Sequence, residues 1–189
     1  LVDKSILEFY HLQTDRIQYK GGTNDLKKLS DFQDEAYSEI KNSFLKKDIT
    51  LLHGITGSGK TEIYCKIIEQ VIKEGKQVLF LLPEIALTTQ IIRRLQTFFG
   101  NQISVFHSKY SMNERVEVWQ NVLNKKTKAQ IILGARSALL LPFSNLGLII
   151  VDEEHETSYK QFDPAPRYNA RDAAIVLAKM HQSKIILGS

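Results

Sequence analysis

Residues 54–61 constrain the fold of this 189-residue chain more strongly than any other part of its sequence. They read Gly-Ile-Thr-Gly-Ser-Gly-Lys-Thr, a full match to the phosphate-binding pattern Gly-x4-Gly-Lys-Thr. This pattern requires a strand before it and a helix after it, because backbone N–H groups and the start of the helix together attract phosphate. An apolar run at 49–53 and an amphipathic segment at 61–74 meet that requirement. The nucleotide-binding residues predicted from the pattern are Gly54, Thr56, Gly57, Ser58, Gly59, Lys60 and Thr61.

The rest of the chain alternates between short apolar runs and amphipathic segments. The apolar runs, typical of buried strands, cover residues 49–53, 77–82, 103–106, 130–133, 148–151 and 184–187. Helices are predicted at 31–45, 61–74 and 88–99, and another after the capping box of Ser111 and Glu114. Trp119 lies on the apolar face of that last helix, so we expect it in the core. The alternation predicts an α/β fold, a mainly parallel sheet with helices on both faces, and ligands beyond the carboxyl ends of the strands.

A second chemical signal is the apolar run at 148–151, which is followed by Asp152, Glu153, Glu154 and His155. A buried strand of this kind brings Asp152 to a Mg²⁺ ion beside the phosphates, where the Thr61 hydroxyl is the other protein ligand. Glu153, one residue further on, is placed to orient and deprotonate the attacking water. Lys60 is expected to reach the β- and γ-phosphates. The two motifs together predict Mg²⁺-dependent hydrolysis of a nucleoside triphosphate, with Glu153, Lys60 and Asp152 as catalytic residues.

Composition excludes several other classes of protein. The single cysteine, Cys65, rules out an intrachain disulfide and a cysteine-rich zinc site within these residues. No segment approaches the roughly 20 apolar residues of a membrane-spanning helix, so we expect a cytoplasmic protein without membrane contact. The net charge of +4 is placed unevenly, since residues 101–136 hold six basic and two acidic side chains. Such a basic stretch suits a polyanion, although a solvated helix surface is the simpler interpretation of the charges alone.

The order of several short strings resembles a known family. Residues 152–155 are similar to the DExH signature of superfamily 2 helicases and translocases. The more specific strings lie at 54–64, 82–90, 106–108, 134–139, 142–147, 152–161 and 167–172. In this order and spacing they resemble the first motor lobe of the PriA family of replication-restart helicases. The resemblance extends over residues 30–189 and implies a RecA-like P-loop NTPase lobe.

The resemblance implies a function and a set of partners. Members of this family couple ATP hydrolysis to 3′-to-5′ movement on DNA and unwind branched structures at stalled forks. The implied cofactors are ATP and Mg²⁺, and zinc is expected only in a part of the parent protein outside this chain. The implied partners are single-stranded and forked DNA and the proteins of primosome assembly.

Further site residues are assigned through this resemblance alone. Gln33 is similar to the family's adenine-reading glutamine, and His155 corresponds to the histidine that couples hydrolysis to movement. The residues matched to DNA-contacting segments are Pro83, Glu84, Arg136, Ser137, Tyr159, Lys160, Phe162, Arg167 and Tyr168. Packing against the lobe is the alternative role for Tyr159 and Tyr168, and an ion pair with a carboxylate is the alternative for Arg136. The sequence departs from the family pattern at 163–166, where Asp-Pro-Ala-Pro replaces an expected Gly-Trp.

The same comparison suggests how the chain is divided. Residues 1–29 are expected to be a linker or the tail of an upstream domain, and residues 30–189 a first RecA-like lobe, truncated at its C-terminus. Gly188 and Ser189 resemble the beginning of a Gly-Ser-Ala-Thr motif. Because such motors usually receive arginine fingers from a second lobe, this chain alone is expected to bind ATP and to hydrolyse it poorly.

Three alternatives remain open on the sequence. A RecG-like or transcription-repair-coupling translocase shares the nucleotide chemistry but lacks the strings after His155. A nucleotide-gated binding platform without effective hydrolysis would not need Glu153. A phosphate-loop enzyme acting on a small molecule is disfavoured by the string at 134–137 and by the aromatic residues after 158.

Overall fold

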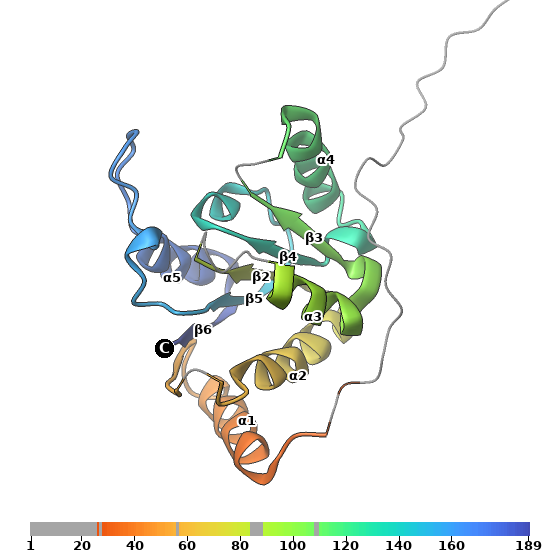
Figure 1. Cartoon of the computed structure of the whole chain (residues 1–189), viewed down its shortest axis with the longest axis vertical. Coiled ribbons are helices and arrows are strands. Elements are labelled where there is room, and N and C mark those ends of the chain that lie inside the picture. Colours follow the sequence, from red (N-terminus) through yellow and green to blue (C-terminus); the bar gives the residue numbers. More distant parts are fainter. Residues whose placement is uncertain (1–25, 27, 56, 84–88, 108–109) are drawn as a thin grey trace, which may run out of the picture.

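A six-stranded parallel sheet forms the centre of the computed structural model, which describes residues 26, 28–55, 57–83, 89–107 and 110–189. Every strand pair is parallel, and the strand order is β1-β6-β5-β2-β4-β3 (Figure 1). The strands are β1 Ile49–Leu52, β2 Gln77–Leu81, β3 Ile103–Phe106, β4 Ile131–Gly134, β5 Leu146–Val151 and β6 Lys184–Gly188. The predicted strands are therefore all present, and their bounds differ from the prediction by at most two residues.

Five α-helices connect and cover the strands of the described segments. They are α1 Asp31–Phe44, α2 Lys60–Lys73, α3 Thr89–Phe99, α4 Met112–Leu123 and α5 Ala170–His181. Ser30 and Ser111 close capping boxes at the starts of α1 and α4, with Gln33 and Glu114 as the reciprocal partners. The capping box predicted at Ser111 is thus confirmed.

The core lies on both faces of the sheet, because successive side chains of a strand point to opposite faces. On one face Val78, Phe80 and Ile150 pack with α1, α2 and α3. On the other face Leu79 and Ile149 pack with α4 and α5. Burial on both faces explains why the strands read as continuous apolar runs rather than as alternating patterns. The predicted α/β lobe with helices on both faces is confirmed.

Helix α4 departs from the sequence prediction at Trp119, whose side chain is 44% exposed. Val118 and Val122 face the sheet and are fully buried, and Glu117 beside them pairs with Lys128 over 3.3 Å. The helix carries one apolar row with Val118 and Val122 and another with Trp119 and Leu123, about 100° from the first around the axis, and only one row can face the core. The placement of Trp119 in the core was therefore wrong, because the row of Val118 and Val122 occupies that position.

The parallel topology brings the loops after β1, β5 and β6 to one edge of the sheet, since β6 pairs with both of its neighbours. Ligand sites in such sheets lie beyond the carboxyl ends of the strands. Among the described helices, none is long and apolar enough to cross a membrane.

Candidate functional site: a phosphate loop beside an acidic strand end

The phosphate loop leaves β1 and enters α2 through two glycines in the left-handed region. Gly57 has φ 84° and Gly59 has φ 85°, values that the backbone of non-glycine residues rarely adopts. Gly59 also packs directly against another predicted site residue, because a Cβ atom at this position would collide with the Gln33 amide. Of the predicted loop residues, Thr56 lies outside the described residues. The remaining loop residues follow the strand–loop–helix arrangement that the motif requires.

Lys60 is the residue on which the site converges. Its ammonium group donates hydrogen bonds to the carbonyl oxygens of Gly54, at 2.7 Å, and Ser189, at 2.9 Å. Its Nζ lies 3.6 Å from Glu153 Oε1. The side chain is only 10% exposed. Lys60 thus links the phosphate loop, the end of β5 and the residue that follows β6.

The three acidic residues after β5 have three different environments. Asp152 is bound by a residue of the protein interior, because its carboxylate accepts a hydrogen bond from the buried Tyr64 hydroxyl at 3.0 Å. Glu153 faces Lys60. Glu154 pairs with Arg171 of α5 over 3.0 Å. Only the first two therefore lie at the predicted nucleotide site, and Glu154 joins the strand end to α5.

Burial dominates the electrostatics of Asp152. It raises the pKa of the Asp152 carboxyl above its usual range, and the hydrogen bond from Tyr64 opposes this shift. The neighbouring Glu153 charge raises the pKa further, while Lys60 lowers it. A carboxylate with these surroundings gains stability from an additional nearby cation.

Glu153 has an unusual backbone conformation, with φ 49° in the left-handed region. For a non-glycine residue this conformation costs of order 1–3 kcal/mol, and such strain is commonly found at functional sites. The side chain lies between Lys60 and His155, whose Nε2 is 3.7 Å from Glu153 Oε2. His155 also lies 3.3 Å, Nδ1 to Oγ, from Ser189. The strained turn therefore places the Glu153 carboxylate beside Lys60, at the start of α2.

Gln33 lies at the start of α1 and is held against the phosphate loop. Its Oε1 accepts a hydrogen bond from Ser30 N at 2.9 Å, and its Nε2 donates to the Gly59 carbonyl at 3.4 Å. The position is consistent with a residue beside a bound base, and its role in adenine recognition stays a prediction.

The segment after the acidic turn contains two aromatic residues with opposite exposure. Tyr159 is 1% exposed, and its hydroxyl lies 2.7 Å from the Asp152 carbonyl and 3.1 Å from the Leu81 carbonyl. Phe162 is 63% exposed, with Lys160 Nζ 4.9 Å from its ring centroid. The prediction that Tyr159 contacts DNA was wrong, because its ring is enclosed and its hydroxyl binds the backbone of β2 and β5.

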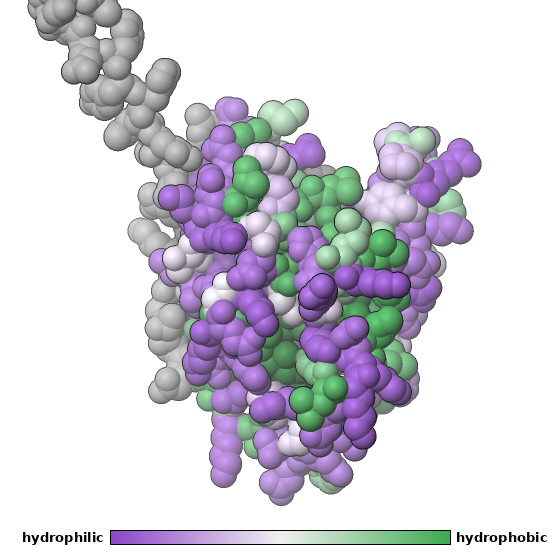
Figure 2. Space-filling view, turned by 180° about the vertical axis from the view of Figure 1, so that it is seen from behind, coloured by the Kyte–Doolittle hydropathy of each residue, from purple (hydrophilic) through white to green (hydrophobic). Residues whose placement is uncertain are grey.

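Residues 160–169 form a loop that projects from the body of the lobe (Figure 1). Lys160 and Asn169 form an antiparallel bridge at its base. The Gln161 amide donates to the carbonyl oxygens of Pro164 and Pro166, at 2.8 and 3.0 Å, and so ties the loop to itself. Figure 2 shows the projection from the opposite side, where it combines hydrophilic side chains with others of intermediate hydropathy. Lys160, Phe162 and Arg167 are exposed on this loop.

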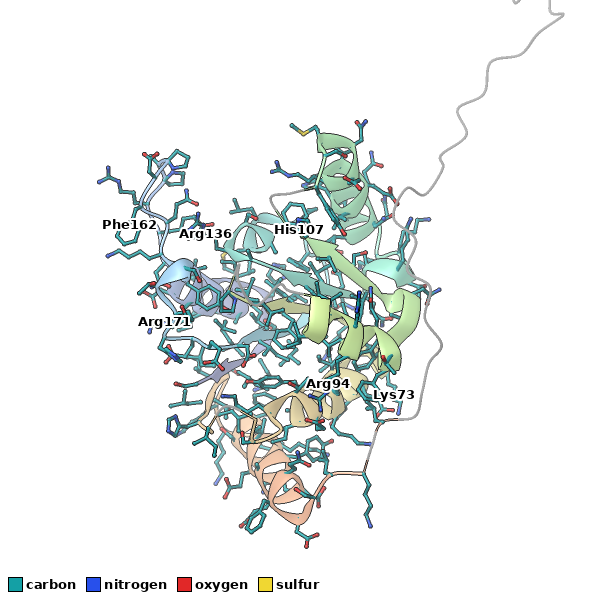
Figure 3. All side chains as sticks on the ribbon, in the orientation of Figure 1. Lys73, Arg94, His107, Arg136, Phe162 and Arg171 are labelled. Carbon is teal, nitrogen blue, oxygen red and sulfur yellow. The ribbon has the colours of Figure 1, made fainter. Side chains whose placement is uncertain are left out.

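Arg136 joins this loop to the end of β4. Its guanidinium donates to the carbonyl oxygens of Ser158 and Lys160, each at 3.2 Å, so its partners are backbone groups rather than a carboxylate. The Tyr168 hydroxyl donates to the Arg136 carbonyl at 3.4 Å, which places this half-buried ring against the lobe. Figure 3 shows Arg136 between the sheet and the projecting loop, with Phe162 further out.

The other predicted DNA contacts are only partly placed. Ser137 is partly buried in the short 3₁₀ helix Arg136–Leu140. Pro83 is buried next to the end of β2, and its contact with DNA stays a prediction. Glu84 lies outside the described residues.

A family comparison decides what kind of lobe this is. The model of the DEAD/DEAH box helicase family matches residues 30–189. The chain belongs to the DEAD/DEAH box helicase family. The match begins one residue before α1 and covers all of the residues predicted for the nucleotide site.

Two bacterial proteins of the same name are similar in sequence to this lobe. It is 45% identical over 163 residues to the replication restart protein PriA of Bacillus subtilis, covering 85% of this chain and 20% of that protein. The identity to the protein of the same name from Haemophilus influenzae is 49% over 142 residues, 75% of this chain and 19% of the relative. The chain thus spans about a fifth of the length of these relatives.

Solved structures support the fold of the helicase lobe. A structure of RecG bound to a three-way DNA junction matches with a TM-score of 0.64 at 24% identity, over 86% of this chain and 21% of that one. The UvsW helicase of bacteriophage T4 matches with a TM-score of 0.60 at 16% identity, over 92% of this chain and 56% of that one. At these identities the likeness extends to the fold alone.

Three residues of the helicase lobe contact the predicted site although the sequence did not predict these contacts. Tyr64 binds Asp152, Arg171 binds Glu154, and Ser189 accepts the hydrogen bond from Lys60. Tyr64 and Arg171 lie in the strings at 54–64 and 167–172, but neither string indicates that these side chains approach the acidic turn from α2 and α5. Gly188 and Ser189 were noted in the sequence, but only the pairing of β6 with β1 and β5 brings them beside Lys60.

The buried position of Tyr159 leads to a stability prediction. We expect Tyr159→Phe to lower the free energy of unfolding by about 1–3 kcal/mol, because two backbone carbonyls lose a buried donor. Urea denaturation of the 189-residue chain measures this loss. Phe162→Leu is the matched control, since an exposed aromatic ring contributes little to stability. Equal midpoints for Tyr159→Phe and the wild type would contradict the assigned structural role.

Proposed function

We propose that this chain is the ATP-binding lobe of a longer ATP-dependent DNA helicase that acts in replication restart. The observation that carries the proposal is the convergence of Lys60, Asp152 and Glu153 at the carboxyl ends of β1 and β5. The phosphate loop supplies backbone N–H groups and the start of α2 for phosphate binding. Membership of the DEAD/DEAH box helicase family fits this arrangement.

The residues have separable roles in hydrolysis. Lys60 exchanges its bonds to the Gly54 and Ser189 carbonyls for bonds to phosphate oxygens. Glu153 accepts a proton from the attacking water. Its carboxylate lies beside the phosphate loop, because Glu153 Oε1 is 3.6 Å from Lys60 Nζ. His155 and Ser189 lie within contact of each other and of this turn, which suits a link between hydrolysis and movement.

The residues present fit a magnesium ion. Thr61 and Asp152 offer oxygen donors of the type that Mg²⁺ prefers, and the buried Asp152 carboxylate gains stability from a cation. Magnesium, when bound, neutralises charge on the phosphates. Asp152 and Thr61 would hold it from the ends of β5 and the phosphate loop.

The DNA contact is proposed at the projecting loop. Phe162 presents an exposed aromatic face with Lys160 beside it, and Arg167 adds a second exposed cation. Bases stack on aromatic faces without regard to sequence, at about 1–3 kcal/mol per base, and cations attract the backbone. Arg136 donates hydrogen bonds to the backbone at the base of the same loop, so it positions the loop in addition to its proposed contact with DNA phosphates.

The finer parts of the function rest on similarity. Relatives at 45% and 49% identity carry the name replication restart protein PriA, which favours unwinding of forked DNA for primosome assembly in the 3′-to-5′ direction. A RecG-like translocase shares the fold but only 24% of the residues, so it is the weaker candidate. A binding platform without hydrolysis is disfavoured by the strained placement of Glu153 against Lys60.

The function is tested with the full-length protein that carries this chain. We expect its ATP hydrolysis to rise at least tenfold with forked or single-stranded DNA, and Phe162→Ala to raise the DNA concentration needed for half-maximal stimulation about tenfold. A loss of about 1–3 kcal/mol in base stacking accounts for that change. Steady-state hydrolysis is measured at fixed salt, because phosphate contacts are salt-dependent.

Two controls accompany this test. Met180→Ala changes another exposed apolar side chain, on α5, and should leave DNA stimulation as in the wild type. The 189-residue chain alone should bind ATP but hydrolyse it poorly without a second lobe. ATP hydrolysis that no DNA stimulates would overturn the helicase proposal, but it would not contradict the proposed nucleotide site.

A further inference from the structure

We propose that Tyr64 is a positioning residue for magnesium-nucleotide binding, which fixes the Asp152 carboxylate and couples it to the end of β6. The inference rests on the proposed function, since it assumes that Asp152 faces the metal. It assigns a role to a residue that is not part of the phosphate loop or the acidic turn.

Tyr64 is placed by α2, one helical turn after the last residues of the phosphate loop. The side chain is fully buried, and its ring packs edge-on against Phe80 of β2 with centroids 5.4 Å apart. Only the hydroxyl reaches a polar partner, Asp152 Oδ1 at 3.0 Å. Phe80 and α2 therefore hold the ring so that its hydroxyl meets the carboxylate that follows β5.

A buried hydroxyl is costly unless it is hydrogen-bonded, so packing alone would favour phenylalanine at this position. The Tyr64 hydroxyl meets this requirement because it donates its proton to Asp152 Oδ1. A donor at this place binds one of the two Asp152 oxygens and leaves the other outside that bond. The carboxylate is thereby held in one orientation before any ligand arrives.

Gly188, near the end of β6, is the third member of this contact. A Cβ atom there would collide with the Tyr64 hydroxyl and lie 2.9 Å from Asp152 Oδ1. The next residue, Ser189, accepts the hydrogen bond from Lys60 and one from Gly54 N. A shift of the β6 end would therefore reach Asp152 through Tyr64 and reach Lys60 through Ser189.

Nucleotide binding to the 189-residue chain tests the positioning role without relying on turnover. The affinity for a fluorescent ADP analogue is measured with Mg²⁺ and with EDTA. We expect Tyr64→Phe to reduce the gain in affinity that Mg²⁺ gives by about tenfold, the size of effect seen when residues that orient a metal ligand are changed. The affinity in EDTA should stay within twofold of the wild type.

The matched control is Tyr37→Phe, which removes a hydroxyl bonded to Gln70 on the surface between α1 and α2. It should leave both affinities unchanged. A loss of the same size with Mg²⁺ and with EDTA would assign Tyr64 a purely structural role and overturn the proposal, as would no loss at all. Failure of the wild type to bind the analogue would instead overturn the proposed function.

The coupling to β6 is tested by a double-mutant cycle. Gly188→Ala should lower the midpoint of thermal unfolding of the wild type, because the new Cβ meets the Tyr64 hydroxyl. In a Tyr64→Phe background the same substitution should cost at least a third less, since the colliding oxygen is gone. Equal shifts in the two backgrounds would overturn the coupling. If Gly188→Ala does not fold alone but folds with Tyr64→Phe, the coupling is supported.

Discussion

Replacing Glu153 with glutamine is expected to lower ATP turnover by the full-length helicase about 10²–10⁴-fold, the usual contribution of a general base. Nucleotide affinity should change less than threefold. Glutamine keeps the size of the side chain and its position opposite Lys60, but it cannot accept the proton of the attacking water. The measurement is kcat in the presence of saturating DNA, together with the affinity for ATP under conditions that prevent turnover.

Glu154→Gln is the matched control, since it changes a carboxylate one residue further along. Glu154 is bound to Arg171 rather than to Lys60, so its loss should cost some stability and leave turnover within a few-fold of the wild type. The opposite ranking of the two variants would show that the base was assigned to the wrong residue of the turn. Comparable losses would mean that the whole turn, and not one carboxylate, supports hydrolysis.

Local patterns were sufficient to predict the sheet and the phosphate loop. Gly57 and Gly59 are required by left-handed backbone, and the apolar runs before and after them are required by burial on both faces of a parallel sheet. Both requirements act within a few residues of the chain, so they can be read without knowledge of the rest of the fold.

The sequence could not predict which of two similar neighbouring residues faces the site, because that depends on contacts between elements far apart in the chain. Glu153 and Glu154 are chemically alike, yet Lys60 of α2 meets one and Arg171 of α5 meets the other. Tyr159 and Phe162 are both aromatic, yet the ring of Tyr159 is buried beside the ends of β2 and β5 while that of Phe162 is exposed. Each difference depends on the side chains and backbone groups of elements that are distant in the sequence, so no local pattern predicts it.

Truncation of Lys60 to alanine should have the largest effect on nucleotide binding. We expect the affinity of the 189-residue chain for ATP to fall about 30- to 100-fold, because a hydrogen bond to a charged group contributes about 1.5–3 kcal/mol and the ammonium can donate more than one. Equilibrium binding of a fluorescent ATP analogue measures the loss. Lys66→Ala is the control, since Lys66 lies further along α2 and pairs with Glu69 over 4.0 Å.

The Lys60 result also separates two sources of binding energy. If the backbone N–H groups and the start of α2 held the phosphates by themselves, Lys60→Ala would bind within threefold of the wild type, and the convergence of Gly54, Glu153 and Ser189 on this side chain would serve only to join the strands. A large loss that spares Lys66→Ala places the charge itself in the site. Because Lys60 is the cation that faces Glu153, we expect Glu153→Gln to cause a smaller loss of turnover in the Lys60→Ala background, the sign that the two side chains support the same step of hydrolysis.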